Sequence, residues 1–98
     1  MNPESHMRES DLIRLLNSIG KSTFVRYYRQ FSDRSLSHED LVDLLPKDYT
    51  LKARHTRVSK ARRILDEGLH RKALELIAKS ERVDGETVLR ARELLKEI

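Results

Sequence analysis

The chain has 98 residues, so it has room for one domain and not for two independent cores. Hydrophobic residues make up 38% of it and charged residues 37%, which predicts a thin core under a highly charged surface. Cysteine is absent, which excludes disulfides, thiolate metal ligands and a cysteine nucleophile. No apolar run is long enough to span a bilayer, and no signal-peptide core is visible, so we expect a cytoplasmic protein without membrane contact.

The first residues of the chain are polar and contain Pro3 and a second methionine, Met7, directly after His6. Such a segment is typical of a vector-derived remnant, although a native flexible arm has the same composition. We therefore assign residues 1–9 to a disordered arm or remnant and residues 10–98 to a single helical domain.

Apolar residues at helical spacing predict the first helices. Ser10 is a candidate cap for a helix that ends at Gly20. A second helix begins at Lys21 or Ser22 and carries an aromatic stripe of Phe24, Tyr27, Tyr28 and Phe31. Such a stripe serves either as core or as a stacking platform for nucleic-acid bases, and we expect core.

The middle of the chain predicts two more helices. Ser37 caps a short helix that Pro46 ends, because the residue before a proline avoids the helical region. The next helix ends at Gly68, but its start is either Leu51 or near His55. The earlier start turns Arg54 and Arg57 toward the apolar side, where they need partners.

A fifth helix starting at Leu69 and a sixth capped by Asp84 form a C-terminal hairpin over residues 69–98. No segment alternates apolar and polar residues as a strand does. The predicted fold is an all-α compact bundle of five to six short helices. The last helix carries more apolar residues than one narrow stripe requires, which indicates a homodimer or protein-partner surface through Val88, Leu94, Leu95 and Ile98.

Several motifs that carry chemistry in other proteins fail here. GKST at Gly20–Thr23 lacks the earlier glycine of a phosphate loop, since Leu15 stands in its place, although Lys21 at a helix start is able to bind one backbone phosphate. The histidines, His6, His38, His55 and His70, show no zinc-site spacing, and no nucleophile elbow is present. We expect no enzyme activity, no metal and no cofactor.

The segment from Thr50 to Leu65 carries six Lys or Arg residues and no acidic residue. On a helix, one side becomes basic and rich in hydroxyl groups. Such a side suits DNA, because Lys and Arg neutralise phosphates and also reach base edges. A solvated helix paired with carboxylates within the fold is the alternative. The candidate nucleic-acid-binding residues are Lys52, Thr56, Arg57, Ser59, Lys60, Arg62 and Arg63.

The order of a short helix, a turn and this basic helix is that of a helix-turn-helix over residues 37–66. LSHEDLVDLLP (Leu36–Pro46) followed by RVSKARRIL (Arg57–Leu65) resembles the C-terminal helix-turn-helix of bacterial sigma factors and LuxR-type regulators. Pro46 replaces the family's turn glycine, and the connection to Arg57 is longer. The resemblance implies DNA contacts by Arg57, Lys60 and Arg63, with Leu41, Leu45, Val58 and Leu65 in the core.

These observations predict a bacterial-type transcriptional regulator that binds double-stranded DNA through the basic helix. A homodimer through the last helix is a secondary expectation, because specific sites commonly consist of two half-sites. The alternatives are a helical adaptor that binds a protein partner through its C-terminal hairpin, and an RNA-binding protein, which charge does not separate from a DNA-binding one.

Overall fold

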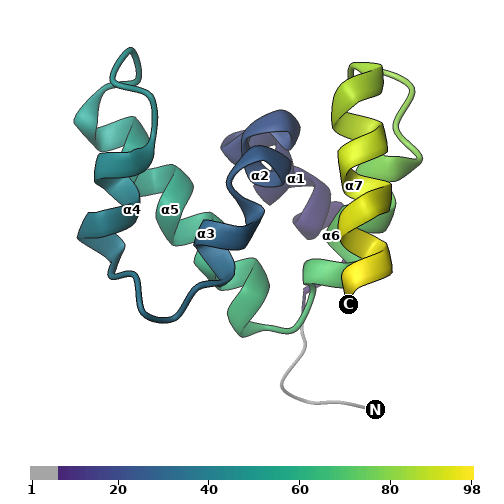
Figure 1. Cartoon of the computed structure of the whole chain (residues 1–98), viewed down its shortest axis with the longest axis horizontal. Coiled ribbons are helices and arrows are strands. Elements are labelled where there is room, and N and C mark those ends of the chain that lie inside the picture. The colour runs from purple at the N-terminus through teal and green to yellow at the C-terminus, as the bar shows by residue number, and fades with distance from the viewer. Residues whose placement is uncertain (1–6) are drawn as a thin grey trace.

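The computed structural model describes residues 7–98, and within that range the chain forms seven helices and no strand. The predicted all-α class is therefore confirmed (Figure 1). Most of the predicted N-terminal arm, residues 1–6, lies outside the described residues. The helices are α1 (Glu9–Ile19), α2 (Lys21–Arg26), α3 (Tyr28–Ser32), α4 (His38–Leu44), α5 (Leu51–Asp66), α6 (His70–Ala78) and α7 (Gly85–Glu97).

The helix count exceeds the expected five or six because the predicted aromatic helix is divided at Tyr27. The ψ angle of Tyr27 is 17°, far from the helical value, and the chain changes direction there. Thr23, Phe24 and Val25 are all buried, and consecutive residues span too wide an arc for one buried side of a straight helix. The break lets α2 pack on α1 and α7 while α3 packs on α5.

The aromatic residues of this region form the core, as predicted. Phe24 and Phe31 have no exposed surface, and Phe24 meets Tyr28 edge to face with ring centroids 5.7 Å apart. Burial raises the pKa of Tyr28 above its usual value. Phe24, Tyr28 and Phe31 are thus not available for stacking on bases, and Tyr27 is half-buried.

The predicted helix caps are partly correct. Ser37 accepts a hydrogen bond from the backbone N–H of Asp40, and Asp84 accepts one from Thr87, both at 3.1 Å. Ser10 is wrong as a cap: the cap is Arg8, two residues earlier, and α1 begins at Glu9, because the Asp11 carboxylate accepts the backbone N–H of Arg8.

The longest helix, α5, lies in the middle of the molecule and contacts α1, α3, α4 and α6 (Figure 1). Its inner side is apolar: Val58, Ala61 and Ile64 have no exposed surface. Figure 1 shows α4 at one side of the molecule and the α6–α7 hairpin at the other, with α1 to α3 between them. The whole measures 35 × 35 × 24 Å.

The hairpin of α6 and α7 uses its apolar residues within the fold. Leu94 is only 2% exposed, and Leu95 packs against the core, so the expected partner surface is wrong for Leu94. Val88 is half-buried, whereas Ile98 is exposed. The additional apolar residues of the last helix are needed because α7 packs on both α6 and α2. None of the helices in residues 7–98 is long and apolar enough to cross a membrane.

Candidate nucleic-acid interface

The water-facing side of α5 carries a line of polar residues that we call the exposed strip. It consists of Lys52, Thr56, Ser59 and Arg63, which are all exposed. Their spacing of four, three and four residues keeps them on one side of a helix. No carboxylate interrupts this side between Leu51 and Leu65. The structure thus brings these predicted site residues together on one surface.

Lys60 lies at the edge of the exposed strip, where α5 meets α1. Its ammonium donates a hydrogen bond to the Ser18 hydroxyl at 2.9 Å, which is a neutral partner. Lys60 and Arg63 line a shallow groove with Arg14 of α1 on its other side. We call this the α1–α5 groove. It is also lined by two carboxylates, Asp11 and Glu67.

Arg14 and Ser18 are site residues that sequence reasoning missed. They occupy positions four apart on α1, on the side that faces α5. The first helix carries no charge run that would single out one arginine. Only the packing of α1 on α5 brings Arg14 next to Lys60 and Arg63.

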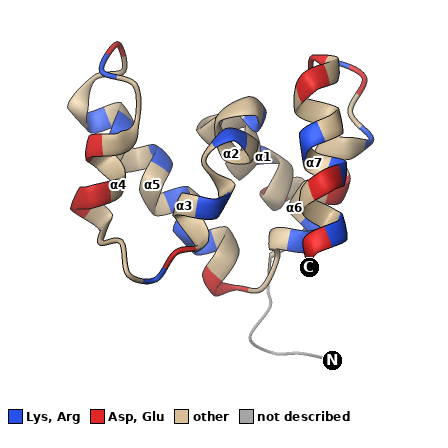
Figure 2. Cartoon of the chain, in the orientation of Figure 1, with Lys and Arg blue, Asp and Glu red and all other residues tan. Residues whose placement is uncertain are grey.

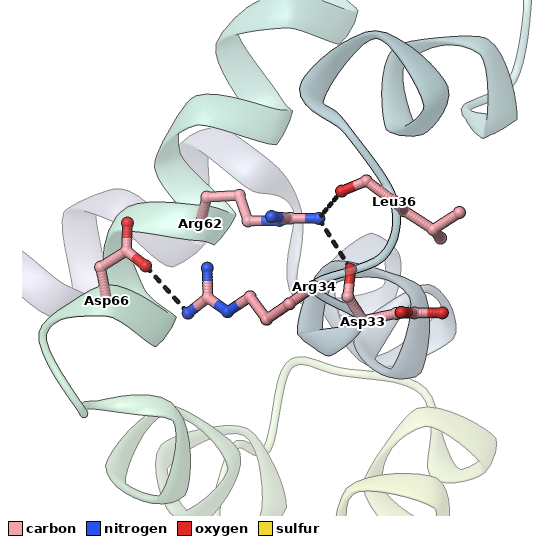
Figure 3. Close-up of polar contacts among 5 residues, drawn as sticks. All are labelled: Asp33, Arg34, Leu36, Arg62 and Asp66. Atoms are coloured by element: carbon pink, nitrogen blue, oxygen red, sulfur yellow. Dashed lines mark hydrogen bonds and ion pairs between the residues drawn. The ribbon is translucent and has the colours of Figure 1, made fainter.

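The structure does not place Arg62 on the exposed strip. Arg62 turns toward the connection between α3 and α4, where Nη2 donates to the backbone carbonyls of Leu36 at 2.7 Å and Asp33 at 3.1 Å (Figure 3). The connection is itself ordered, since the Ser35 hydroxyl and backbone N–H both donate to the Asp33 carboxylate and lower its pKa. Arg62 therefore holds the fold together, and its prediction as a DNA contact is withdrawn.

Arg57 is also held within the fold. Its guanidinium lies over the ring of Tyr49, 4.1 Å from the centroid, in a cation–π contact. This position follows from the early start of the helix at Leu51, where the Thr50 hydroxyl caps it. The early start also turns Arg54 inward, where it donates to the carbonyl of Val42 at 3.3 Å. Arg57 thus contacts an aromatic ring and Arg54 a backbone carbonyl, and neither is paired with a carboxylate.

Carboxylates limit the basic surface on two sides. At the C-terminal end of α5, Glu67 pairs with Arg63 at 3.0 Å, and Asp66 pairs with Arg34 at 2.9 Å. Both arginine side chains are exposed, although Glu67 is only 25% exposed, so water and salt screen the two pairs in part. On the other flank, α4 carries Glu39, Asp40 and Asp43, and Figure 2 shows its acidic segments. The α1 side of α5 therefore carries cations together with carboxylates, whereas the charged residues of α4 are carboxylates alone.

The GKST segment lies at the junction of α1 and α2. Lys21 and Ser22 line a second shallow groove together with Arg82 and Asp84 of the α6–α7 connection. The Lys21 ammonium is 3.5 Å from the Ser80 hydroxyl. The helix before Gly20 and the absence of a preceding strand among the described residues leave no phosphate loop here.

The α4–α5 pair has the order of a helix-turn-helix, with residues 45–50 between the two helices. The second helix begins at Leu51, well before the Arg57 at which the family resemblance places its recognition sequence.

In residues 7–98 no three His, Asp or Glu side chains gather as a metal site would require. Comparisons with protein-family models, with curated proteins and with solved structures find no match to this chain. The sigma-factor and LuxR-type resemblance therefore stays a prediction.

Proposed function

We propose that this protein binds duplex DNA through the exposed strip and the α1–α5 groove. The single observation that carries the proposal is a continuous water-facing surface, free of carboxylates from Leu51 to Leu65, on which Thr56 and Ser59 lie between Lys52 and Arg63. Lys and Arg in such an arrangement neutralise backbone phosphates, and hydroxyl groups donate to phosphate oxygens. A regulatory role in transcription rests on the family resemblance alone.

The surface extends across two helices, which suits a duplex better than a small anion. Arg14 and Lys60 add charge on the α1 side of the strip, and neither has a carboxylate partner among the described residues. The contacts proposed for DNA are thus Arg14, Lys52, Thr56, Ser59, Lys60 and Arg63. Since two of the predicted arginines point into the fold, backbone phosphates carry more of the proposed binding than base edges do.

The test removes three positive charges from this surface. The triple variant Lys52→Gln, Lys60→Gln, Arg63→Gln is titrated into a fluorescein-labelled mixed-sequence DNA duplex, and anisotropy gives Kd between 50 and 200 mM salt. We expect Kd to rise by more than about tenfold at the lowest salt, and the slope of log K against log salt to fall by about three units.

The matched control removes the same charge elsewhere. Lys79, Arg90 and Lys96 are exposed and have no ion-pair partner among the described residues, so the variant Lys79→Gln, Arg90→Gln, Lys96→Gln has the same net charge as the first. It is expected to change Kd by no more than about twofold. An equal rise in Kd in the two variants, or no binding of DNA by the wild type at 50 mM salt, would overturn the proposal.

An RNA duplex of the same length separates DNA from RNA. The proposal expects weaker binding of the RNA, because its A-form grooves present the phosphates at different spacings. Tighter binding of RNA than of DNA would replace the DNA proposal.

The adaptor alternative has less support, since Leu94, which we expected to contribute to a partner surface, is buried in the core.

A further inference from the structure

Two histidines meet between α4 and α5. His38 is the first residue of α4 and His55 lies near the start of α5, and both are half-buried. Nε2 of His38 is 2.8 Å from Nδ1 of His55. The ring planes are 19° apart and the centroids are separated by 5.0 Å. That separation is about the nitrogen–nitrogen distance plus the radii of both rings, so the rings meet edge to edge in nearly one plane.

This geometry is that of a shared proton. A short contact between two imidazole nitrogens requires an N–H on one ring and a lone pair on the other. In the edge-to-edge arrangement the two facing nitrogens are directed at each other. A chelated metal would need both lone pairs to converge on a third point instead. No further His, Asp or Glu among residues 7–98 completes a metal site here.

The surroundings offer no compensation for two protonated rings. Neither imidazole has a carboxylate oxygen within 4.0 Å in the described part of the chain. Asp40 is bonded to the backbone N–H of Ser37, and Arg62 and Arg54 are bonded to backbone carbonyls. The other charged residues close in sequence to the pair are Glu39 and Asp43 on α4, Lys52 and Arg57 on α5, and Asp33 and Arg34 on the connection before α4.

We propose that His38 and His55 form a pH-sensitive latch that holds α4 against α5. One proton is shared between the facing nitrogens, and a first additional proton is able to bind an outer nitrogen without breaking that bond. A second additional proton places an N–H on both facing nitrogens. The hydrogen bond is then lost and two positive charges repel each other at close range, so α4 loosens from α5.

The sign of the effect follows from proton counting. In acid, the unfolded chain binds an additional proton on each of these side chains, whereas the folded pair with its bond intact binds only one. Because the unfolded state then binds more protons, stability falls as the pH falls and returns as it rises. The latch therefore weakens as the solution becomes more acidic.

The experiment is a double-mutant cycle on the full chain at two pH values. The Tm values of the wild type, His38→Ala, His55→Ala and the double variant are measured by circular dichroism at pH 7.5 and pH 4.5. At pH 7.5 the double variant should lose less than the sum of the single losses, by about 4 to 8 °C. At pH 4.5 this difference should vanish or change sign, because the bond is broken and the two protonated rings repel each other.

His70 provides the control, since it lies at the start of α6 and takes no part in the contact. The pair His38→Ala and His70→Ala is expected to be additive at both pH values. Long-range nitrogen–proton NMR of the wild type at pH 7.5 should also show one facing nitrogen protonated and the other not. Additivity at pH 7.5, equal non-additivity at both pH values, or two unprotonated facing nitrogens would each overturn the proposal.

Discussion

Arg62 and Arg34 are neighbours in Figure 3, but their partners differ in kind. Arg62 is half-buried and donates to two backbone carbonyls, of which that of Asp33 also accepts the backbone N–H of Leu36, whereas that of Leu36 lies in part-buried surroundings. Arg34 reaches an exposed carboxylate, Asp66, and both side chains are more than half exposed, at 58% and 60%. Water therefore replaces the ion pair of Arg34 more easily than the hydrogen bonds of Arg62.

We therefore expect unequal effects of the same substitution at the two positions. Arg62→Met keeps the apolar part of the side chain and should lower the free energy of unfolding by about 1.5 to 3 kcal/mol, because carbonyls are left without their charged donor. Arg34→Met should cost no more than about 1 kcal/mol. Urea denaturation followed by circular dichroism measures both. Equal losses would mean that Arg62 does not hold the α3–α4 connection.

At the scale of elements, the cap of α7 shows how one carboxylate fixes a helix start. Asp84 accepts hydrogen bonds from the Thr87 hydroxyl at 2.8 Å and from its backbone N–H at 3.1 Å. The hydroxyl contact, followed by the backbone contact, lowers the pKa of Asp84 from its usual 3.8. The ionised carboxylate is therefore the form that stabilises the helix start.

Asp84→Ala should lower Tm at pH 7, because the N–H of Thr87 loses its acceptor. A lowered folded pKa means that the carboxylate contributes stability at every pH above 3.8 and that the contribution is lost as the pH falls through the folded value. Asp84→Asn keeps an oxygen acceptor and should retain most of the Tm at pH 7. Thermal melts from pH 7 to pH 2 test this: the gap between wild type and Asp84→Ala should close toward pH 2.

The sequence predicts elements well where local chemistry decides them. Ser37, Pro46 and Asp84 mark helix ends correctly, because caps and proline act within a few residues. It fails where packing decides, as at Tyr27, where two halves of one periodic pattern pack on different partners. The sequence leaves the start of α5 open between Leu51 and His55, because Arg54 and Arg57 suit an inner side only once the carbonyl of Val42 and the ring of Tyr49 are in place.

For the candidate site, the charge run correctly locates the basic helix but not its outward side. Lys52, Thr56, Ser59 and Arg63 are exposed as expected, whereas Arg57 and Arg62 bind within the fold. Periodicity alone does not separate an arginine that meets solvent from one that meets a backbone carbonyl, because both lie at the margin of the same arc.

At the scale of the whole molecule, α7 carries one leucine that lies in the core and another that lies on the surface. Leu94 is 2% exposed where α7 meets the rest of the fold, and Leu89 is 61% exposed on the same helix. Leu94→Ala should lower the free energy of unfolding by about 2 to 5 kcal/mol, because it leaves a cavity. Leu89→Ala should change it by no more than about 0.5 kcal/mol. Chemical denaturation at several protein concentrations measures both.

The concentration series also tests the homodimer prediction. A Leu94→Ala loss that is independent of protein concentration is expected for a residue buried in its own chain. A loss that grows with dilution would instead place Leu94 at a subunit interface.

The position of α4 at one side of the molecule has a further consequence. It packs chiefly on α5, whereas the helices around α1 support one another from several directions. Helices with a single neighbour open locally at lower free energy than those enclosed by several. Detachment of α4 would uncover Leu41, Val42 and Leu45, so we expect this end of the molecule to expose apolar surface before the remaining helices separate.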